Sequence, residues 1–211
     1  MADTPRTLVS LPLFPLGAVL YPGGRLSLRV FEVRYLDMVR KCHTLGAPFG
    51  VVALTSGTEV RQAGAAPETL APVGTLCHVE SLVSPQPGLL TIQCSGSERF
   101  RTTQCERRIN GLWIADVHLL PEAPAVPLPD DLQPCADALE RLLTQLAARA
   151  PDTPGPVATP WRLDDCGWVA NRWCELLPFP LPQKQPLLEL DNHMIRLELV
   201  WDYLQQSGIG A

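Results

Sequence analysis

Lysine is almost absent from this sequence, which contains only Lys41 and Lys184. A P-loop requires a lysine within Gly-x-x-x-x-Gly-Lys-Ser/Thr, because that lysine and the loop amides hold the β- and γ-phosphates of a nucleotide. Neither lysine lies in such a motif, and neither is accompanied by a protease-type serine motif. The sequence therefore predicts no ATPase and no Ser-Lys protease.

Long apolar runs are also missing. Prolines interrupt the most apolar part of the N-terminus, so no run approaches the roughly 18 residues of a membrane-spanning helix. The same interruption, with the charged Asp3 and Arg6, argues against a signal peptide. The seven cysteines are odd in number and lack the paired spacing of a disulfide framework. We expect a cytoplasmic protein with no membrane partner.

Motifs for catalysis and metal binding are lacking as well. There is no Gly-x-Ser-x-Gly elbow, and no Cys-x-x-Cys or His-x-x-x-His spacing. The neighbours Cys42-His43 and Cys77-His78 cannot serve each other, because adjacent residues of a helix or strand do not face one another. We therefore expect no catalytic residue, no metal and no cofactor.

The net charge of −5 argues against a nucleic-acid partner, since such binding depends on clustered lysine and arginine. Four arginines nonetheless lie close together in the sequence, at Arg99, Arg101, Arg107 and Arg108. They form either a local basic patch or the solvated end of a hairpin.

The segment 11–54 carries the clearest structural signals. An apolar opening strand is followed by the hinge Tyr21-Pro22-Gly23-Gly24, and the alternation over 25–30 is typical of a strand buried on one face. A helix is predicted from about Phe31 to Gly46, with Glu32 in its first turn. A buried strand is predicted over 49–54.

Further strands are predicted in the middle of the chain. Residues 55–72 are predicted to form a long surface loop, and a three-strand meander follows, with a bulge near Gly96 and a turn at Asn110-Gly111. A half-open β-barrel with one inserted helix satisfies these patterns.

The proline-rich stretch 121–129 is predicted to separate a barrel subdomain, residues 1–121, from a helical subdomain, residues 122–211, that docks on it. The first helix is expected to be capped by Asp130 or Asp131, and the second to span 163–177. A short turn at 183–190 then leads to Asp191, the expected cap of the third helix. Four tryptophans are expected to anchor this part, Trp161, Trp168, Trp173 and Trp201.

Several segments together resemble the N-terminal substrate-binding domain of Lon proteases. Five pieces carry the resemblance in the right order: Leu-Pro-Leu-Phe-Pro-Leu with Tyr-Pro-Gly and Leu-x-Leu-x-Val-Phe-Glu-x-Arg-Tyr, then 49–52, 73–77, 96–101 and 115–122. One departure is Val33, where the family usually carries proline. The resemblance implies an α+β fold, a PUA-like pseudobarrel followed by a C-terminal helical bundle, in a copy without the ATPase and protease domains of full Lon proteases.

Three functions follow as hypotheses. The resemblance implies a non-catalytic module that binds polypeptide segments, partner proteins or itself, through barrel edges or an apolar groove at the junction of barrel and helices. An enzyme would instead need an enclosed pocket with Glu32, Glu80, His78 or His118 among its lining. An RNA-binding protein would need a basic face with exposed aromatics.

Seven residues are candidates for a contact surface: Tyr21, Pro22, Arg34, Tyr35, Arg99, Phe100 and Trp168. Each also has a structural interpretation. Arg34 is then expected to bridge a carboxylate or carbonyl groups at the barrel end, while Tyr35 and Phe100 fill the interface between strands and helix.

Overall fold

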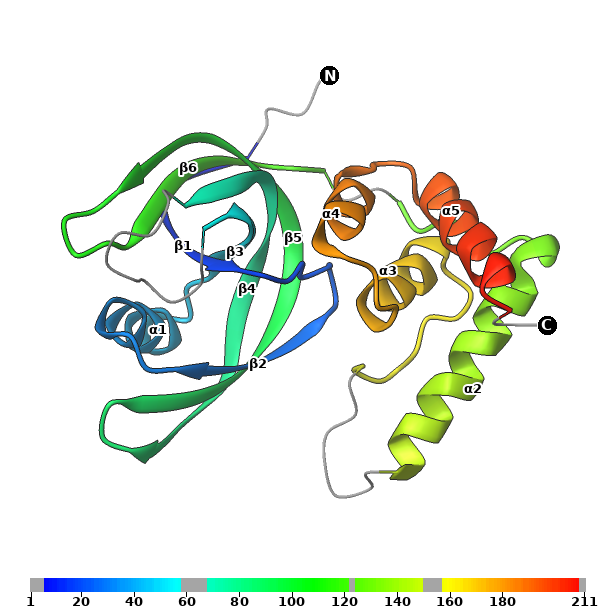
Figure 1. Ribbon diagram of the computed structural model, residues 1–211, viewed down its shortest axis with the longest axis horizontal. Coiled ribbons are helices and arrows are strands. Elements are labelled where there is room, and N and C mark those ends of the chain that lie inside the picture. Colours follow the sequence, from blue (N-terminus) through cyan, green and yellow to red (C-terminus); the bar gives the residue numbers. More distant parts are fainter. Residues whose placement is uncertain (1–5, 58–67, 122–123, 150–156, 209–211) are drawn as a thin grey trace. The chain divides into compact units, whose positions relative to one another are not determined.

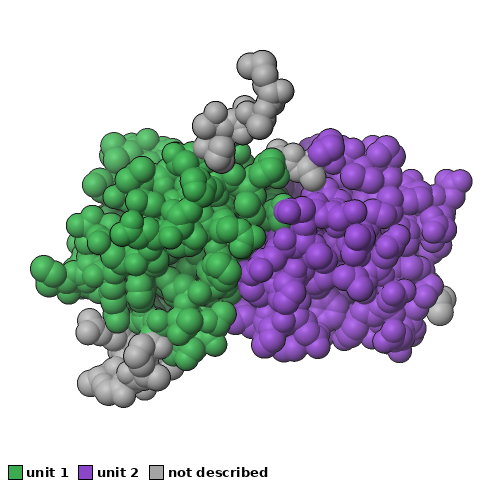
Figure 2. Space-filling view, turned by 90° about the horizontal axis from the view of Figure 1, so that it is seen from above, with its two compact units in different colours: residues 1–122 green, residues 123–211 purple. Residues whose placement is uncertain are grey.

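The computed structural model describes residues 6–57, 68–121, 124–149 and 157–208. The chain divides into two compact units, Met1–Glu122 and Ala123–Ala211, which Figure 2 shows in different colours. Each unit is described separately below. Within the described residues, no helix combines the length and the apolar character that crossing a membrane requires.

The described residues of the first unit form a six-stranded sheet with one helix (Figure 1). The strand order is β2-β5-β4-β3-β1-β6, and an additional β5–β6 pairing closes the ladder into a ring. The strands are β1 (Thr7–Leu16), β2 (Arg25–Val30), β3 (Phe49–Ser56), β4 (Thr69–Gln86), β5 (Leu89–Arg107) and β6 (Trp113–Leu119). Five strands thus form a closed barrel, where the sequence predicted a half-open one, and β2 extends the sheet beyond the ring.

The long strands β4 and β5 serve two apolar cores, because they extend beyond the ring toward β2. One core fills the barrel interior around Leu13, Val52 and Phe100. The other lies between α1 (Val33–Leu45) and the sheet formed by β2, β5 and β4, around Tyr35, Val39 and Ile92. The inserted helix therefore covers the face that the alternation of β2 leaves apolar.

Several predicted boundaries are confirmed, and others shift. The register of β4 against β5 slips between Thr75 and Cys77, opposite Gly96, where the sequence predicted a bulge. A Cβ atom at Gly96 would lie 2.6 Å from the carbonyl oxygen of Tyr21, so glycine is needed for this close approach. The predicted loop over 55–72 is too long, because its last residues from Thr69 belong to β4; its central part lies outside the described residues.

Helix α1 begins at Val33, two residues later than predicted. Glu32 is its N-cap residue instead of a first-turn residue, and the Glu32 side chain makes no capping hydrogen bond. The helix ends as predicted at Gly46, whose φ of 61° is the left-handed conformation that glycine adopts without strain.

The second unit contains four α-helices and a short 3₁₀ helix among its described residues. They are η1 (Asp130–Leu132), α2 (Gln133–Arg149), α3 (Cys166–Leu176), α4 (Leu181–Glu189) and α5 (His193–Gln206). Leu139 and Leu143 of α2, Val169 and Trp173 of α3, and Leu197 of α5 are buried. Together with the sheet of the first unit, these helices confirm the predicted α+β class.

Three predictions about the second unit are wrong. Asp130 and Asp131 do not cap α2, because they form the 3₁₀ turn that precedes it. The predicted turn at 183–190 is largely helix α4, which tolerates Pro182 in its first turn, where the amides have no helical partner. The cap of α5 is Asn192 instead of Asp191, since the Asn192 side chain accepts hydrogen bonds from the amides of Met194 and Ile195.

Candidate functional site

The structure places the seven candidate residues mostly inside their units. Tyr21 and Phe100 are fully buried, Tyr35 is 3% exposed, and Arg34 and Arg99 are almost as buried. Pro22 is half-buried. Trp168 belongs to α3 of the second unit, where the Arg172 guanidinium lies 5.8 Å from the centre of its ring. Five of the seven side chains are thus buried and make contacts within their unit. A contact surface in this region would have to be formed by other residues.

Arg34 connects the first turn of α1 to the β5–β6 turn. Its Nη1 donates a buried hydrogen bond of 2.6 Å to the carbonyl oxygen of Gly111, and its Nη2 lies 3.1 Å from the Glu32 carboxylate. The guanidinium also lies 4.5 Å from the centre of the Tyr35 ring, which stacks on Phe14 at 4.2 Å. These contacts match the structural interpretation of Arg34, which joins a carboxylate and a carbonyl at the barrel end.

The Tyr35 hydroxyl lies in an electrostatic cluster at this end of the barrel. Burial raises the pKa of Tyr35 to about 12, partly offset by the positive charge of Arg34. Glu68 and Arg107 also act on this hydroxyl. They are paired at 3.3 Å, and Glu68 accepts a hydrogen bond of 2.5 Å from the Trp113 indole. Charges of both signs therefore act on a buried phenol that stays protonated well above neutral pH.

Three large apolar side chains project into solvent close to this cluster in the chain. Phe31 and Val33 flank Glu32 and are 55% and 72% exposed, and Ile109, two residues before Gly111, is fully exposed. The Arg34–Gly111 hydrogen bond brings the two chain segments that carry them together. These residues were not predicted from the sequence. An isoleucine directly before the polar turn Asn110-Gly111 could have indicated an exposed apolar side chain. Exposed apolar groups on a well-held frame are typical of surfaces that bind other chains.

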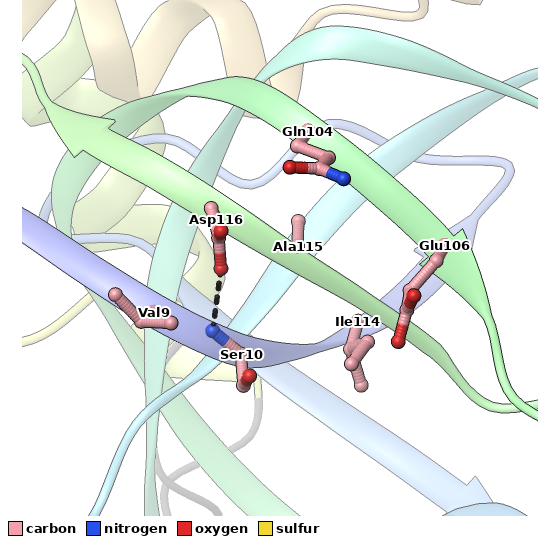
Figure 3. A pocket seen from close by; sticks show the side chains of 7 residues that line it. All are labelled: Val9, Ser10, Gln104, Glu106, Ile114, Ala115 and Asp116. Atoms are coloured by element: carbon pink, nitrogen blue, oxygen red, sulfur yellow. Dashed lines mark hydrogen bonds between the residues drawn. The ribbon is translucent and has the colours of Figure 1, made fainter.

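The same unit contains a small open pocket of about 200 Å³ (Figure 3). It is lined by Val9, Ser10, Gln104, Glu106, Ile114, Ala115 and Asp116. None of the residues that an enzyme hypothesis would place in a pocket, Glu32, Glu80, His78 or His118, lines it.

Two β-bulges shape this pocket. β1 carries an extra residue opposite β6 between Leu8 and Leu11, and Ser10 there has a φ of 57°. The Ser10 amide donates to the Asp116 carboxylate at 2.9 Å, the dashed line in Figure 3. On the other side β5 bulges at Thr103, whose hydroxyl donates to the Asp116 carbonyl oxygen at 2.9 Å. Asp116 thus stabilises both irregular strands. Its carboxylate and its carbonyl oxygen each accept a hydrogen bond from within the sheet.

The nucleophilic side chains are held in structural positions. All seven cysteines are free, and only Cys105 is exposed. A hydrogen bond with Cys94 and burial both raise the pKa of the Cys77 thiol, which disfavours the reactive thiolate. Cys42 and Cys77 are buried, whereas His43 is exposed and His78 half-buried. No three histidine, cysteine or acidic side chains of the described chain converge in a way that could hold a metal ion.

The four arginines at positions 99, 101, 107 and 108 do not form a uniform basic face. Arg99 is buried, Arg107 pairs with Glu68, and Arg108 lies 3.3 Å from Glu106. Arg101 is exposed. Carboxylates therefore neutralise two of the four guanidiniums locally.

A closed barrel with one helix inserted between its strands, followed in the chain by a helical unit, defines an α+β domain built around a sheet. Comparison with known families identifies it further. The chain matches the substrate-binding domain of the ATP-dependent protease La (LON) over residues 10–206, and it belongs to that family.

Solved structures agree with this assignment. The chain is similar to a Lon N-terminal domain protein from Xanthomonas campestris, with 34% identity and a TM-score of 0.71 over 93% of this chain and 99% of that one. The N-terminal domain of a Mycobacterium avium complex Lon protease shares the fold at a TM-score of 0.60, with 16% identity over 93% and 98% of the two chains. A comparison with curated proteins found no match.

Proposed function

We propose that this protein is a non-catalytic recognition module that binds unfolded polypeptide segments. The observation that carries the proposal is the exposure of three large apolar side chains, Phe31, Val33 and Ile109, on the two chain segments that the Arg34–Gly111 hydrogen bond joins. Unfolded chains expose apolar side chains that folded partners bury, so a surface of this kind favours them. Membership of a family described as substrate-binding supports the same class of ligand.

The frame beneath these residues favours binding without a large rearrangement. Arg34 fixes the first turn of α1 against the β5–β6 turn through its contacts with Gly111 and Glu32. A surface that is ordered before binding loses less conformational entropy when a ligand arrives. The free cysteines are consistent with work in a reducing compartment, which supports the expected cytoplasmic location.

The test uses reduced, carbamidomethylated α-lactalbumin as a permanently unfolded probe and native α-lactalbumin as the folded comparison. We expect the wild-type protein to bind the unfolded form and not the folded one. The double variant V33S/I109S should lower the affinity about tenfold, because two apolar contacts are lost.

The matched control is V9S/L45S, which removes two other exposed apolar side chains, Val9 at 74% and Leu45 at 66% exposure, from the same unit. It should bind as the wild type does. Equal weakening by both variants would show nonspecific adhesion, and absence of binding by the wild type would end the proposal.

A further inference from the structure

β2 is the only strand of the described sheet that lies outside the barrel ring, and it pairs with β5 alone. Its six residues pair with β5 without any register shift, and the strand contains no proline. Figure 1 shows it running beside β5 and leading into α1. A regular edge of this kind can accept an additional strand from another chain.

The backbone groups at this edge can be assigned from one hydrogen bond. The Gly96 amide donates to the Gly24 carbonyl oxygen at 2.9 Å, in the register that continues along β2. In an antiparallel pair, successive residues point their backbone groups alternately toward the partner strand and away from it. The amides and carbonyls of Arg25, Ser27 and Arg29 therefore point away from β5, and no described residue bonds to them.

The other half-paired strand at this end is protected. Beyond Val79, β4 pairs with β5 alone among the described residues. Its register against β5 shifts at Glu80 and again before Gln86, and Pro85 is its next-to-last residue. Bulges and proline are the devices by which natural sheets prevent unwanted strand addition. β2 has neither, so the two edges differ in the property that strand addition requires.

The exposed face next to β2 sets the chemistry of a partner. Across the three strands, Arg25 aligns with Ser95 and His78, Ser27 with Gln93 and Ser81, and Arg29 with Thr91 and Val83. No carboxylate occupies these nine positions. Arg25 and Arg29 are exposed and four residues apart, so an added strand would face them with two side chains that are also four apart.

The opposite face of β2 is apolar. Leu26 and Leu28 are half-buried and pack against the core under α1. In an added strand, the side chains between the two that face the arginines would alternate in direction. Those on the opposite face would therefore lie beside Leu26 and Leu28. Cross-strand pairs of opposite charge and of apolar side chains both stabilise a sheet.

We infer that the outer edge of β2 binds an extended polypeptide segment that carries two acidic residues four positions apart with apolar residues between them. The segment would add as a seventh strand and receive backbone hydrogen bonds from Arg25, Ser27 and Arg29. This inference rests on the proposed function and specifies its mode, because it names a second contact of the same unfolded chain.

The probe is a fluorescent peptide containing Glu-Val-Thr-Val-Glu, and its control carries lysine in place of both glutamates. The wild type should bind the acidic peptide about tenfold more tightly than the lysine peptide, and the preference should shrink with added salt. The variant R25S/R29S should lose the preference. Equal affinity of the wild type for both peptides would overturn the assigned chemistry.

Ser27→Pro tests the backbone edge, because it removes an outward amide without removing a bond to β5. Ser27→Ala keeps that amide and is the matched control. We expect S27P to lose peptide binding at least tenfold while S27A binds as the wild type does. If S27P does not fold, hydrogen exchange on the wild type decides, since the acidic peptide should protect the amides of Arg25, Ser27 and Arg29.

The outcomes separate the two proposals. Peptide binding that is equal in S27P and S27A, or amides that stay unprotected, would overturn the edge-strand inference, while retained binding of unfolded α-lactalbumin would leave the proposed function intact. Protection of the same amides by raised protein concentration alone would identify a second copy as the occupant, and that too would overturn the inference.

Discussion

Arg34 and Gly111, 77 positions apart in the chain, are joined by a buried hydrogen bond of 2.6 Å from the guanidinium to the carbonyl oxygen. The same guanidinium pairs with Glu32 and lies over the Tyr35 ring. One side chain therefore sets the position of the first turn of α1 relative to the β5–β6 turn, and with it the distance between Phe31, Val33 and Ile109.

Replacing Arg34 with methionine should destabilise the first unit by about 2–4 kcal/mol, because the Glu32 carboxylate and the Gly111 carbonyl both lose a buried partner. Urea unfolding gives the free energy. Arg40→Met is the control, since Arg40 is exposed on the same helix and lies 4.0 Å from Asp37; its effect should stay within about 0.5 kcal/mol. Similar midpoints for the two variants would contradict the assigned role of Arg34.

The raised pKa of Tyr35, about 12, predicts a pH dependence of stability. The unfolded phenol ionises near pH 10 and the folded one near pH 12, so the stabilising contribution is complete below about pH 10 and is lost as pH rises through about 12. Urea midpoints between pH 8.5 and 11.5 should fall more steeply for the wild type than for Tyr35→Phe. If the urea midpoints of the two proteins fell equally with pH, the pKa of the Tyr35 phenol would not be raised in the folded state.

Local patterns were sufficient to predict most of the barrel. The alternation of Leu26, Leu28 and Val30 predicted β2 and its buried face, and Gly46 predicted the end of α1. Errors arose where neighbouring residues are chemically interchangeable. Asp191 and Asn192 can both cap a helix, and the sequence offers no way to choose between them. Helix α4 was missed because Pro182 and Pro186 are usually helix breakers.

The candidate surface was harder to predict, because exposure depends on tertiary contacts. Phe31 and Tyr35 are both large aromatic residues in the same predicted helix. In the structure, however, Phe31 is 55% exposed and Tyr35 is buried and stacks on Phe14. The difference is set by the register of β1 and the position of α1, which sequence periodicity does not report. Sequence periodicity likewise does not report the bulge at Thr103 in the β5–β6 pair that closes the ring, or the bulge at Ser10 in the β1–β6 pair.

Cysteine reactivity should distinguish one thiol from the other six. Only Cys105 is exposed in the folded chain, and burial together with the neighbouring Glu106 raises the pKa of its thiol. We expect a disulfide reagent such as DTNB to modify one thiol in the native protein, slowly at pH 7 and faster as pH rises toward 9. Cys105→Ser should remove that phase. Rapid native reaction of further thiols would contradict the burial of the core cysteines.

The barrel interior should not tolerate a methyl group at Gly50. A Cβ atom there would lie 2.7 Å from Leu13 Cδ2 and 2.7 Å from Phe100 Cζ. Gly50→Ala should destabilise the protein by about 1–3 kcal/mol through overpacking. In a Phe100→Leu background the same change should cost less, because the ring that it strikes is gone. A cost that does not depend on residue 100 would mean that the strain lies in the backbone instead.

In the second unit, stability should depend strongly on Arg196, which is 1% exposed. Its Nε donates to the Leu187 carbonyl oxygen at 2.7 Å, its Nη1 donates to the Asn171 side chain at 2.7 Å, and its Nη2 donates to the Leu190 carbonyl oxygen. It therefore binds the end of α4 to α3 and α5. Arg196→Met should leave these acceptors unsatisfied and cost about 3 kcal/mol.

The measurement is thermal unfolding followed by circular dichroism at 222 nm, where helices dominate the signal. Arg141→Met, an exposed position on α2, is the control and should change the midpoint little. Asn171→Ala should cost less than Arg196→Met, because it removes one of the three acceptors and leaves the two carbonyls paired. If Arg196→Met were no worse than Arg141→Met, the buried guanidinium would not be what holds α3, α4 and α5 together, and their apolar contacts would have to suffice.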